Sequence, residues 1–172
     1  MNKKLSPRLL RLAAHVEAGE TLCDIGPDHA YLPRLLVSRG VCPRVVLSDV
    51  KEGPLRQAWG SVCTELGEDR PFRAPSGIGP YAFRLGDGLA ALSAGEVDAV
   101  VIAGMGGETI IAILGADAAK TASFRKFILQ PRTKADELRG WLQGAGWTIS
   151  AEETATEKGR DCRIIVASPP AG

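Results

Sequence analysis

The sequence has 172 residues, of which 45% are hydrophobic and 24% charged, and its net charge is +1. Such values are typical of one soluble globular domain with a sizeable core, and they give no overall field that would draw the protein to nucleic acid or to a membrane. A local basic patch remains compatible with them, because partner choice depends on where charge lies.

The cysteines and the N-terminus indicate a cytoplasmic protein. The four cysteines are Cys23, Cys42, Cys63 and Cys162. They show no CxxC pair or other zinc spacing, so we expect no metal site. Three of them lie in apolar stretches, which is typical of buried cysteines in a reducing compartment. Charged residues interrupt any signal-peptide core, and no uncharged run approaches the roughly 20 residues of a bilayer span. We therefore expect a soluble cytoplasmic monomer that does not bind a membrane.

The first half of the chain alternates helical patterns with short apolar runs. Leucines recur with a helical period over residues 5–18, and Gly19 then ends the helix. The runs ETLCDIG and RVVLSDV predict strands, and each is followed by a helical pattern. Asp28 is a plausible N-cap for the first of these helices, and Pro54 begins the second.

The second half begins with an irregular stretch. Residues 67–80 hold three prolines and three glycines and predict an insertion without regular structure. The runs YAFRLGDG, VDAVVIAGMGG and FRKFILQP predict strands, the second of them buried on both faces. Helices are predicted over Glu108–Ala119 and after Thr133, which forms a capping box with Asp136. WTISAEETAT and DCRIIVAS form a hairpin around EKGR, and residues 168–172 are predicted to be a disordered tail.

The order of these elements predicts the architecture. Five strands that alternate with helices indicate a parallel, doubly wound sheet, and a short turn can join only antiparallel neighbours. We therefore expect an α/β fold of the Rossmann-like class I methyltransferase type, with a doubly wound seven-stranded sheet whose last strand is antiparallel. Residues 1–172 are predicted to form a single methyltransferase domain, with an N-terminal helix in residues 1–19 and no internal repeat.

Four polar or glycine-rich segments fall at the carboxyl ends of predicted strands, where ligands bind in open α/β sheets. They are the segment from Asp24 to His29, Asp49, the GDG run at 86–88 and the run AGMGG. The first segment lacks GxGxxG, so a dinucleotide is disfavoured, although Gly26 would let a ligand approach the backbone closely. A cofactor without phosphate fits better, and S-adenosylmethionine is such a cofactor, since it is a nucleoside that carries an amino acid.

Each segment has a ligand role and a purely structural alternative. Asp49 could accept hydrogen bonds from both ribose hydroxyls, or it could be a turn residue. Asp87 could accept one from the adenine amino group, although GDG alone is a common turn. Asp24, Asp28 or His29 could hold the methionine end of the cofactor. Asp28 could instead only cap a helix, and His29 could be structural.

Five motifs together resemble one family. CDIGPDHAYLP, SDVKEGPLRQA, RLGDGL, VVIAGMGGETIIAIL and ILQPRTKADELRGWL resemble the bacterial tRNA (adenine(22)-N1)-methyltransferase family, in the same order, between about Leu5 and Val166. The resemblance implies S-adenosylmethionine as methyl donor and N1 of an adenosine in the D-arm region of tRNA as acceptor. The cofactor-binding residues that we expect are Asp24, Gly26, Asp28, His29, Asp49, Asp87, Gly88, Ala103 and Gly104. Those expected at the point of methyl transfer are Gly104, Met105, Gly106 and Tyr31.

Three features depart from the pattern of this family. Its members usually continue into a C-terminal coiled-coil arm, whereas this sequence stops at Gly172. Residues 67–80 look like an insertion before the third strand. Cys162 stands where the final strand usually carries an aromatic residue.

The expected chemistry needs little from the protein beyond alignment. Adenine N1 carries a lone pair, so no strong base is needed, and a paired target base must first be turned out. Met105 could pack on that base or on the sulfonium, and Tyr31 could stack on the base or belong to the core. The candidate phosphate contacts, each of which could instead be a solvated helix face, are Lys3, Lys4, Arg8, Arg11, Arg132, Lys134 and Arg139.

Two other functions stay open at this point, and a third is disfavoured. The chain could be a methyltransferase that acts on another RNA or on a small molecule. It could also be a non-catalytic module that binds a nucleoside or RNA. An NAD-dependent oxidoreductase is disfavoured by the single glycine of the first loop.

Overall fold

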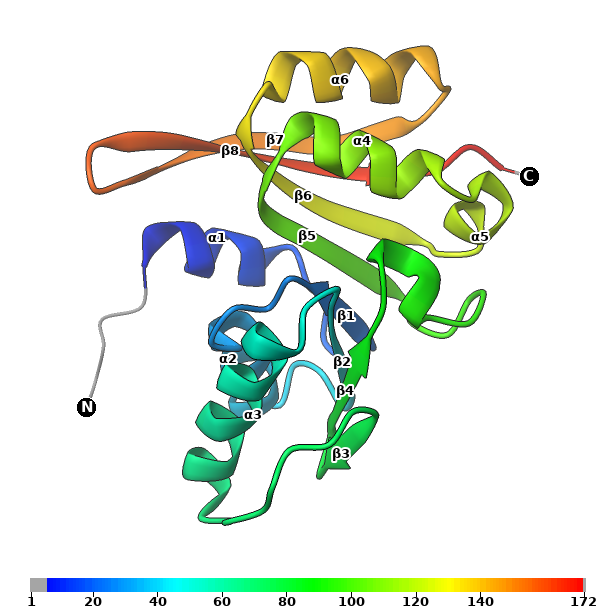
Figure 1. Cartoon of the computed structure of the whole chain (residues 1–172). Coiled ribbons are helices and arrows are strands. Elements are labelled where there is room, and N and C mark those ends of the chain that lie inside the picture. Colours follow the sequence, from blue (N-terminus) through cyan, green and yellow to red (C-terminus); the bar gives the residue numbers. More distant parts are fainter. Residues whose placement is uncertain (1–5, 172) are drawn as a thin grey trace.

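One twisted sheet runs through the part of the chain that the computed structural model describes, residues 6–171 (Figure 1). Its eight strands lie in the order β3-β4-β2-β1-β5-β6-β8-β7. The strand bounds are β1 Leu22–Ile25, β2 Val45–Asp49, β3 Ser76–Ile78, β4 Tyr81–Leu85, β5 Ala99–Gly106, β6 Lys126–Thr133, β7 Thr148–Glu157 and β8 Arg160–Ser168. The helices are α1 Pro7–Ala14, α2 Tyr31–Ser38, α3 Glu52–Leu66, the 3-10 turn η1 Gly88–Ala91, α4 Gly107–Gly115, α5 Ala118–Ala122 and α6 Ala135–Gly144.

The strand directions confirm the predicted class of fold. Strands β4, β2, β1, β5 and β6 are parallel, and β8 runs antiparallel to both β6 and β7. The expected count of seven strands is wrong by one, because β3 pairs antiparallel with β4 at the edge of the sheet. This strand lies within residues 67–80, so that segment is not irregular throughout. Three residues with a central glycine are too few to show the alternation by which a strand is predicted.

The helices bury both faces of the sheet, as a doubly wound fold requires. Alternate residues of β5 pack into two hydrophobic clusters, one on each face of the sheet. Val101 packs in the cluster that contains residues of α1, α2 and α3. Val100 and Ile102 pack in the other cluster, with residues of α4 and α6. Figure 1 shows the same division, with α4 and α6 on one side of the strands and α1, α2 and α3 on the other. Because both faces are covered, a ligand can reach the sheet mainly at its ends.

Two predicted helix caps are wrong. The cap of α2 is Ala30, with a φ of 58°, and no side chain caps the helix, so Asp28 does not have that role. The cap of α6 is Lys134, with a φ of 56°, so Thr133 forms no capping box. A side-chain cap needs extended backbone at the cap residue, whereas here the chain enters each helix through a left-handed residue. Asp136 instead accepts a hydrogen bond from Arg163 of β8.

Two further helix boundaries differ from the expected ones. Helix α3 begins at Glu52, two positions before Pro54, which lies in its first turn. The single helix expected over Glu108–Ala119 is two helices, because α4 ends at Gly115 and a new helix begins at Ala118. The side chain of Asp117 caps α5 by accepting a hydrogen bond from the backbone N–H of Lys120 at 2.9 Å. These shifts leave the strand ends in place.

Candidate functional site

The predicted polar segments meet at one edge of the sheet. Strands β1, β2, β4 and β5 are parallel neighbours, so their carboxyl ends lie side by side. Asp24 is the last residue but one of β1, Asp49 ends β2, and Asp87 follows β4. Two cavities open at this edge. Both are lined by Gly26, which follows β1.

The smaller cavity, of about 480 Å³, brings Asp49 and Asp87 together. One oxygen of Asp49, Oδ1, accepts a hydrogen bond from the backbone N–H of Lys51 at 2.8 Å. Asp49 therefore does stabilise the turn after β2, as the structural alternative predicted. Its other oxygen, Oδ2, has no hydrogen-bond partner among residues 6–171. Gly88, Leu89 and Met105 also line this cavity, so its lining combines acids with apolar side chains.

The larger cavity, of about 740 Å³, lies between α1, the β1–α2 loop, and the ends of β5 and β6. Asp24, Asp28 and Tyr31 line it together with Ala103 and Gly104, all of which were predicted as site residues. The tip of the β7–β8 hairpin forms its far wall. The cavity is therefore lined both by predicted site residues and by the β7–β8 hairpin, which comes from the C-terminal part of the chain.

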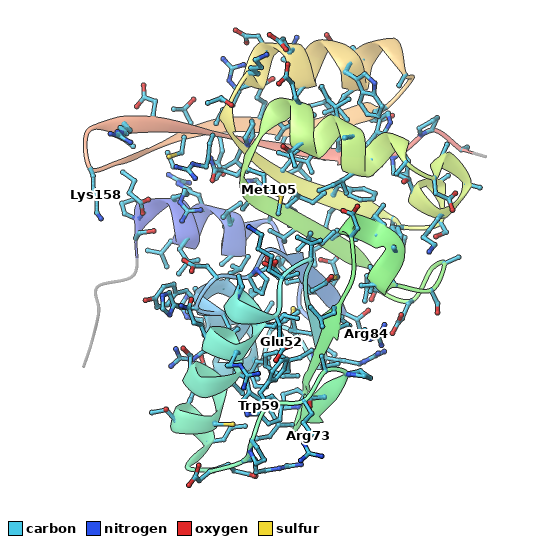
Figure 2. The ribbon with its side chains drawn as sticks, viewed as in Figure 1. Glu52, Trp59, Arg73, Arg84, Met105 and Lys158 are labelled. Carbon is cyan, nitrogen blue, oxygen red and sulfur yellow. The ribbon has the colours of Figure 1, made fainter. Side chains whose placement is uncertain are left out.

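Gly26 marks the junction of the two cavities. Its φ of +73° is readily adopted only by glycine, and a Cβ at this position would lie 2.7 Å from Met105 Cε. Met105 is partly buried and covers Gly26 from the side of the smaller cavity; Figure 2 labels it near the centre of the view. Gly104 has a φ of +76°, and a Cβ there would meet nothing within 4 Å, so it opens onto the larger cavity.

Asp24 is a buried acid with an unusual environment. Its side chain is 6% exposed, and no hydrogen bond reaches its carboxylate from any residue in 6–171. The pKa of Asp24 is raised to about 7, mainly by burial; the charge of Arg8 lowers it, and the charge of Asp28 adds to the rise. A carboxylate that faces a cavity without a partner has the character of a binding group for a cation.

Arg8 is held at the wall of the larger cavity by two other elements. Its Nη1 donates to Oε1 of Gln130 in β6 at 3.2 Å, and its Nε donates to Oε2 of Glu157 in β7 at 3.2 Å. Gln130 is itself buried and donates through Nε2 to the carbonyl of Pro131 at 3.0 Å. This chain of contacts fixes the orientation of Arg8 and ties α1 to the sheet.

Four predicted site residues lie at the margin of the cavities or outside them. The backbone of Asp28 is left-handed, with a φ of 51°, and its side chain is 74% exposed. His29 lines neither cavity, and its Nε2 lies 3.8 Å from Oδ1 of Asp28. The ring of Tyr31 lies 5.5 Å from that of His29 and faces the larger cavity. Gly106 also lines neither cavity, and its Cα packs against Thr133, whose Oγ1 would lie 3.3 Å from an added Cβ.

Several lining residues were not predicted. Val50 is 65% exposed and lines the smaller cavity beside Asp49. An apolar residue directly after a strand-end acid is a signal that could have identified it. Gln130, Glu157 and Asp161 line the larger cavity, and no local pattern marks them, because distant strands bring them together.

Most of the predicted phosphate contacts are already engaged with acids. Besides Arg8, Arg11 lies 3.6 Å from Glu153, and Arg139 lies 2.7 Å from Glu152. Lys134 pairs with Glu108. Arg132 has no ion pair within residues 6–171, and Lys3 and Lys4 lie outside the described residues.

Residues 6–171 contain no group of three or more His, Cys, Asp or Glu side chains placed to hold a metal ion. Within the same residues, no helix combines the length and the apolar character that crossing a bilayer requires.

Comparisons with known proteins identify relatives of the whole sheet. Residues 5–165 match the family described as a methyltransferase domain. The tRNA (adenine(22)-N(1))-methyltransferase of Bacillus subtilis is 34% identical over 165 residues, which are 95% of this chain and 65% of that protein. The chain spans less than two thirds of the length of the curated relatives that it matches.

Solved structures agree with this similarity. The B. subtilis m1A22 tRNA methyltransferase TrmK is 32% identical, with a TM-score of 0.83, over 98% of this chain and 68% of that one. Streptococcus pneumoniae Sp1610, in complex with S-adenosyl-L-methionine, is 37% identical, with a TM-score of 0.84, over 98% of this chain and 74% of that one. The family expected from the sequence motifs is thus confirmed. The chain belongs to the methyltransferase domain family and, within it, to the tRNA (adenine(22)-N1)-methyltransferases.

Proposed function

We propose that this chain transfers a methyl group from S-adenosylmethionine to N1 of an adenosine in tRNA, at position 22 in the D-arm. The observation that carries the proposal is the meeting of two acid-lined cavities at Gly26. Similarity to the B. subtilis enzyme over 95% of the chain supports the acceptor. The S. pneumoniae relative, whose structure contains S-adenosyl-L-methionine, supports the methyl donor.

The smaller cavity fits the nucleoside part of the donor. Asp49 offers carboxylate oxygens to ribose hydroxyls, and Asp87 offers an acceptor to the adenine amino group. Val50 and Leu89 supply apolar surface for the base, and Gly88 removes side-chain bulk beside it. Pockets for small molecules typically combine such apolar walls with a few placed polar groups.

The larger cavity fits the amino-acid part of the donor and the target base. The donor carries positive charge on its sulfonium and its ammonium group, and Asp24, whose carboxylate accepts no hydrogen bond from residues 6–171, lines this cavity. A cation beside Asp24 would favour its ionised form and so compensate its burial. Gly26, Ala103 and Gly104 leave room for the donor at the strand ends. Asp28 lies farther out, on the same wall.

The residues of this chain position the reactants. When bound, S-adenosylmethionine supplies a methyl group activated by its sulfonium sulfur. Adenine N1 has a lone pair, so no side chain has to remove a proton before methyl transfer. Alignment of two bound reactants contributes up to about 7 to 11 kcal/mol in favourable cases. Leu9, Leu12 and Tyr31 enclose the acceptor side and exclude water, and we assign Met105 to packing on the donor, because it lies over Gly26 in the smaller cavity.

The direct test is methyl transfer to unmodified tRNA, followed by nucleoside analysis for 1-methyladenosine. The wild-type protein should form 1-methyladenosine at position 22. Asp49→Asn should bind S-adenosylmethionine about 10- to 100-fold more weakly, because a hydrogen bond to a charged group contributes about 1.5 to 3 kcal/mol. Calorimetric titration measures that affinity.

Asp69→Asn is the matched control for Asp49→Asn, since it makes the same change at an exposed acid that lines neither cavity. Its affinity for the donor should equal that of the wild type. Donor binding without methylation of any RNA would favour a non-catalytic module. Methylation of a different nucleotide or of a small molecule would keep the class of enzyme and overturn the acceptor.

We also propose that residues 1–172 act as one methyltransferase domain, as a monomer, in the cytoplasm. Cys23, Cys42 and Cys63 are buried and unpaired, which suits a reducing compartment. Light scattering of the purified protein, with and without tRNA, measures the oligomeric state. A stable dimer without RNA would contradict the monomer.

A further inference from the structure

The lysines and arginines of the chain fall into two groups. Most of those within residues 6–171 lie within 4.0 Å of an acid. The cations in the same residues without such a pair are Arg39, Lys51, Arg73, Lys120, Arg132, Lys158 and Arg160. Unpaired cations are those whose charge is free to attract an anion.

Three of these unpaired cations surround the larger cavity. Arg132 lies at the carboxyl end of β6, and Lys158 and Arg160 lie at the tip of the β7–β8 hairpin. All three are exposed. Figure 2 shows Lys158 at the end of the hairpin, beyond α1, whereas Arg73 lies at the opposite end of the molecule. Three of the seven unpaired cations in residues 6–171 therefore line the cavity proposed for the target base.

Acids line this cavity as well. Asp24 is buried within it, and Asp28 lines the wall. The acids of the hairpin have partners: Glu157 accepts from Arg8 at 3.2 Å, and Asp161 Oδ1 accepts from Thr156 Oγ1 at 2.8 Å. A phosphate is thus attracted to the three exposed cations, whereas an uncharged base can lie deeper in the cavity, beside Asp24. This arrangement orients a nucleotide with its base inward.

Ion pairs with α1 hold the hairpin at this place. Arg8 pairs with Glu157, and His15 Nε2 lies 2.6 Å from Oε1 of Glu153. Arg11 lies 3.6 Å from Oε2 of the same glutamate. Because these contacts already position the hairpin, its tip loses less conformational entropy when it binds an anion.

We infer that Arg132, Lys158 and Arg160 form a phosphate clamp, which holds the RNA backbone on both sides of an adenosine turned into the larger cavity. The inference rests on the proposed function and adds the surface on which the RNA lies. Of the phosphate contacts expected from the sequence, it keeps Arg132. Four others already pair with acids: Arg8, Arg11, Lys134 and Arg139. The clamp recognises backbone charge and contributes no base sequence preference of its own.

A matched pair of triple variants tests the clamp. The clamp variant carries Arg132→Gln, Lys158→Gln and Arg160→Gln. The control variant carries Arg39→Gln, Lys51→Gln and Arg73→Gln, which removes the same charge from exposed, unpaired residues that line neither cavity. Binding of an unmodified tRNA transcript is measured by fluorescence anisotropy over a range of salt concentrations, and thermal melting confirms that both variants fold.

The clamp variant should lose both affinity and salt dependence. Each phosphate contact to a single strand contributes about 0.7 to the slope of log K against log salt concentration, so losing three contacts should lower that slope by about 2. The control variant should keep the wild-type slope. Equal weakening in both variants, wild-type binding by the clamp variant, or no binding by the wild type at low salt would each overturn the inference.

Cys162 provides a second readout that does not depend on methylation. It lines the larger cavity, whereas the other three cysteines are buried. Bound tRNA should slow the reaction of Cys162 with a maleimide several-fold in the wild type, and not in the clamp variant. Unchanged reaction of the wild type with saturating tRNA would contradict the clamp.

The same variants separate the clamp from the proposed function. If the wild type binds S-adenosylmethionine and methylates tRNA while the clamp variant binds RNA normally, the clamp is wrong and the function stands. If RNA binds through the clamp but no 1-methyladenosine forms, the function is wrong and the clamp stands.

Discussion

Two carboxylates of this protein lie in opposite environments. Asp24, in β1, is 6% exposed and accepts no hydrogen bond from residues 6–171, and burial raises its pKa to about 7. Glu96 precedes β5 and accepts hydrogen bonds from Arg84, from the backbone of Ser93 and from Arg44. These bonds, with that of Arg84 as the largest cause, lower the pKa of Glu96 to about 2.

The difference distinguishes a structural acid from a binding acid. A buried carboxylate is costly unless it is paired, and Glu96 has all its partners within the chain. Asp24 accepts no hydrogen bond from residues 6–171 and lines a cavity. Our proposal uses this difference, since it assigns the acid without a donor to the cationic ligand.

Asp24→Asn should have the largest effect on stability. The folded pKa of about 7 lies above the ordinary value, so between about pH 4 and pH 7 the folded protein keeps a proton that the unfolded chain has lost. Wild-type stability should fall as pH rises through this range, by up to about 4 kcal/mol. Urea unfolding at pH 5 and pH 8 should show this fall in the wild type and in Asp69→Asn, but not in Asp24→Asn. Parallel pH profiles of wild type and Asp24→Asn would contradict the account.

Glu96→Gln should cost about 1 to 3 kcal/mol at neutral pH, because it leaves Arg84 and Arg44 without their charged acceptor. The folded pKa is depressed to about 2, so the contribution of Glu96 is present above its unfolded pKa and is lost as pH falls towards 2. The stability difference between wild type and variant, from denaturant unfolding, should shrink below about pH 4.5. A difference that grows with acidity would show that the pairing is not ionic.

Affinity for S-adenosylmethionine should rise with pH in the wild type. The cationic ligand favours ionised Asp24, so binding at pH 5.5 must first remove its proton. Calorimetric titration at pH 5.5 and pH 7 should give an increase on the order of tenfold, since each pKa unit corresponds to a factor of ten. Asp24→Asn should show a flat profile over the same range. An equal increase in both proteins would assign the titration to another group.

Arg8→Met should have the smallest effect. It removes a partly exposed ion pair with Glu157, so stability should change by less than about 1 kcal/mol. Because the charge of Arg8 lowers the pKa of Asp24, the pH midpoint of the Asp24 effect should move upward. Arg11→Met is the matched control on the same helix, and its pH midpoint should equal that of the wild type. Identical midpoints in both variants would exclude electrostatic contact between Arg8 and Asp24.

Much of the fold and half of the site could be predicted from the sequence. Buried parallel strands appear as apolar runs, and the residue types that follow them mark the ligand edge. Asp49 and Asp87 were predicted for one site by this reasoning, and they share the smaller cavity. Gly106 was included because it stands in the same run as Gly104, yet its backbone faces Thr133 instead.

The rest depends on contacts between distant parts of the chain. Arg8 and Glu157 are 149 positions apart, and their ion pair, with Gln130 beside it, forms one wall of the larger cavity. No local pattern could show that the hairpin tip reaches α1. The sequence likewise could not show which basic residues are paired, so it pointed to Arg11 and Arg139 and missed Lys158 and Arg160.

The central claim is that one ligand occupies both cavities and crosses between them at Gly26. A crystal structure of the protein with S-adenosylmethionine tests it most directly. The ribose should lie against Asp49, the adenine beside Asp87 and the amino-acid end beside Asp24, with the donor passing over Gly26. A ligand confined to one cavity, or an Asp24 carboxylate that turns away from it, would contradict the account.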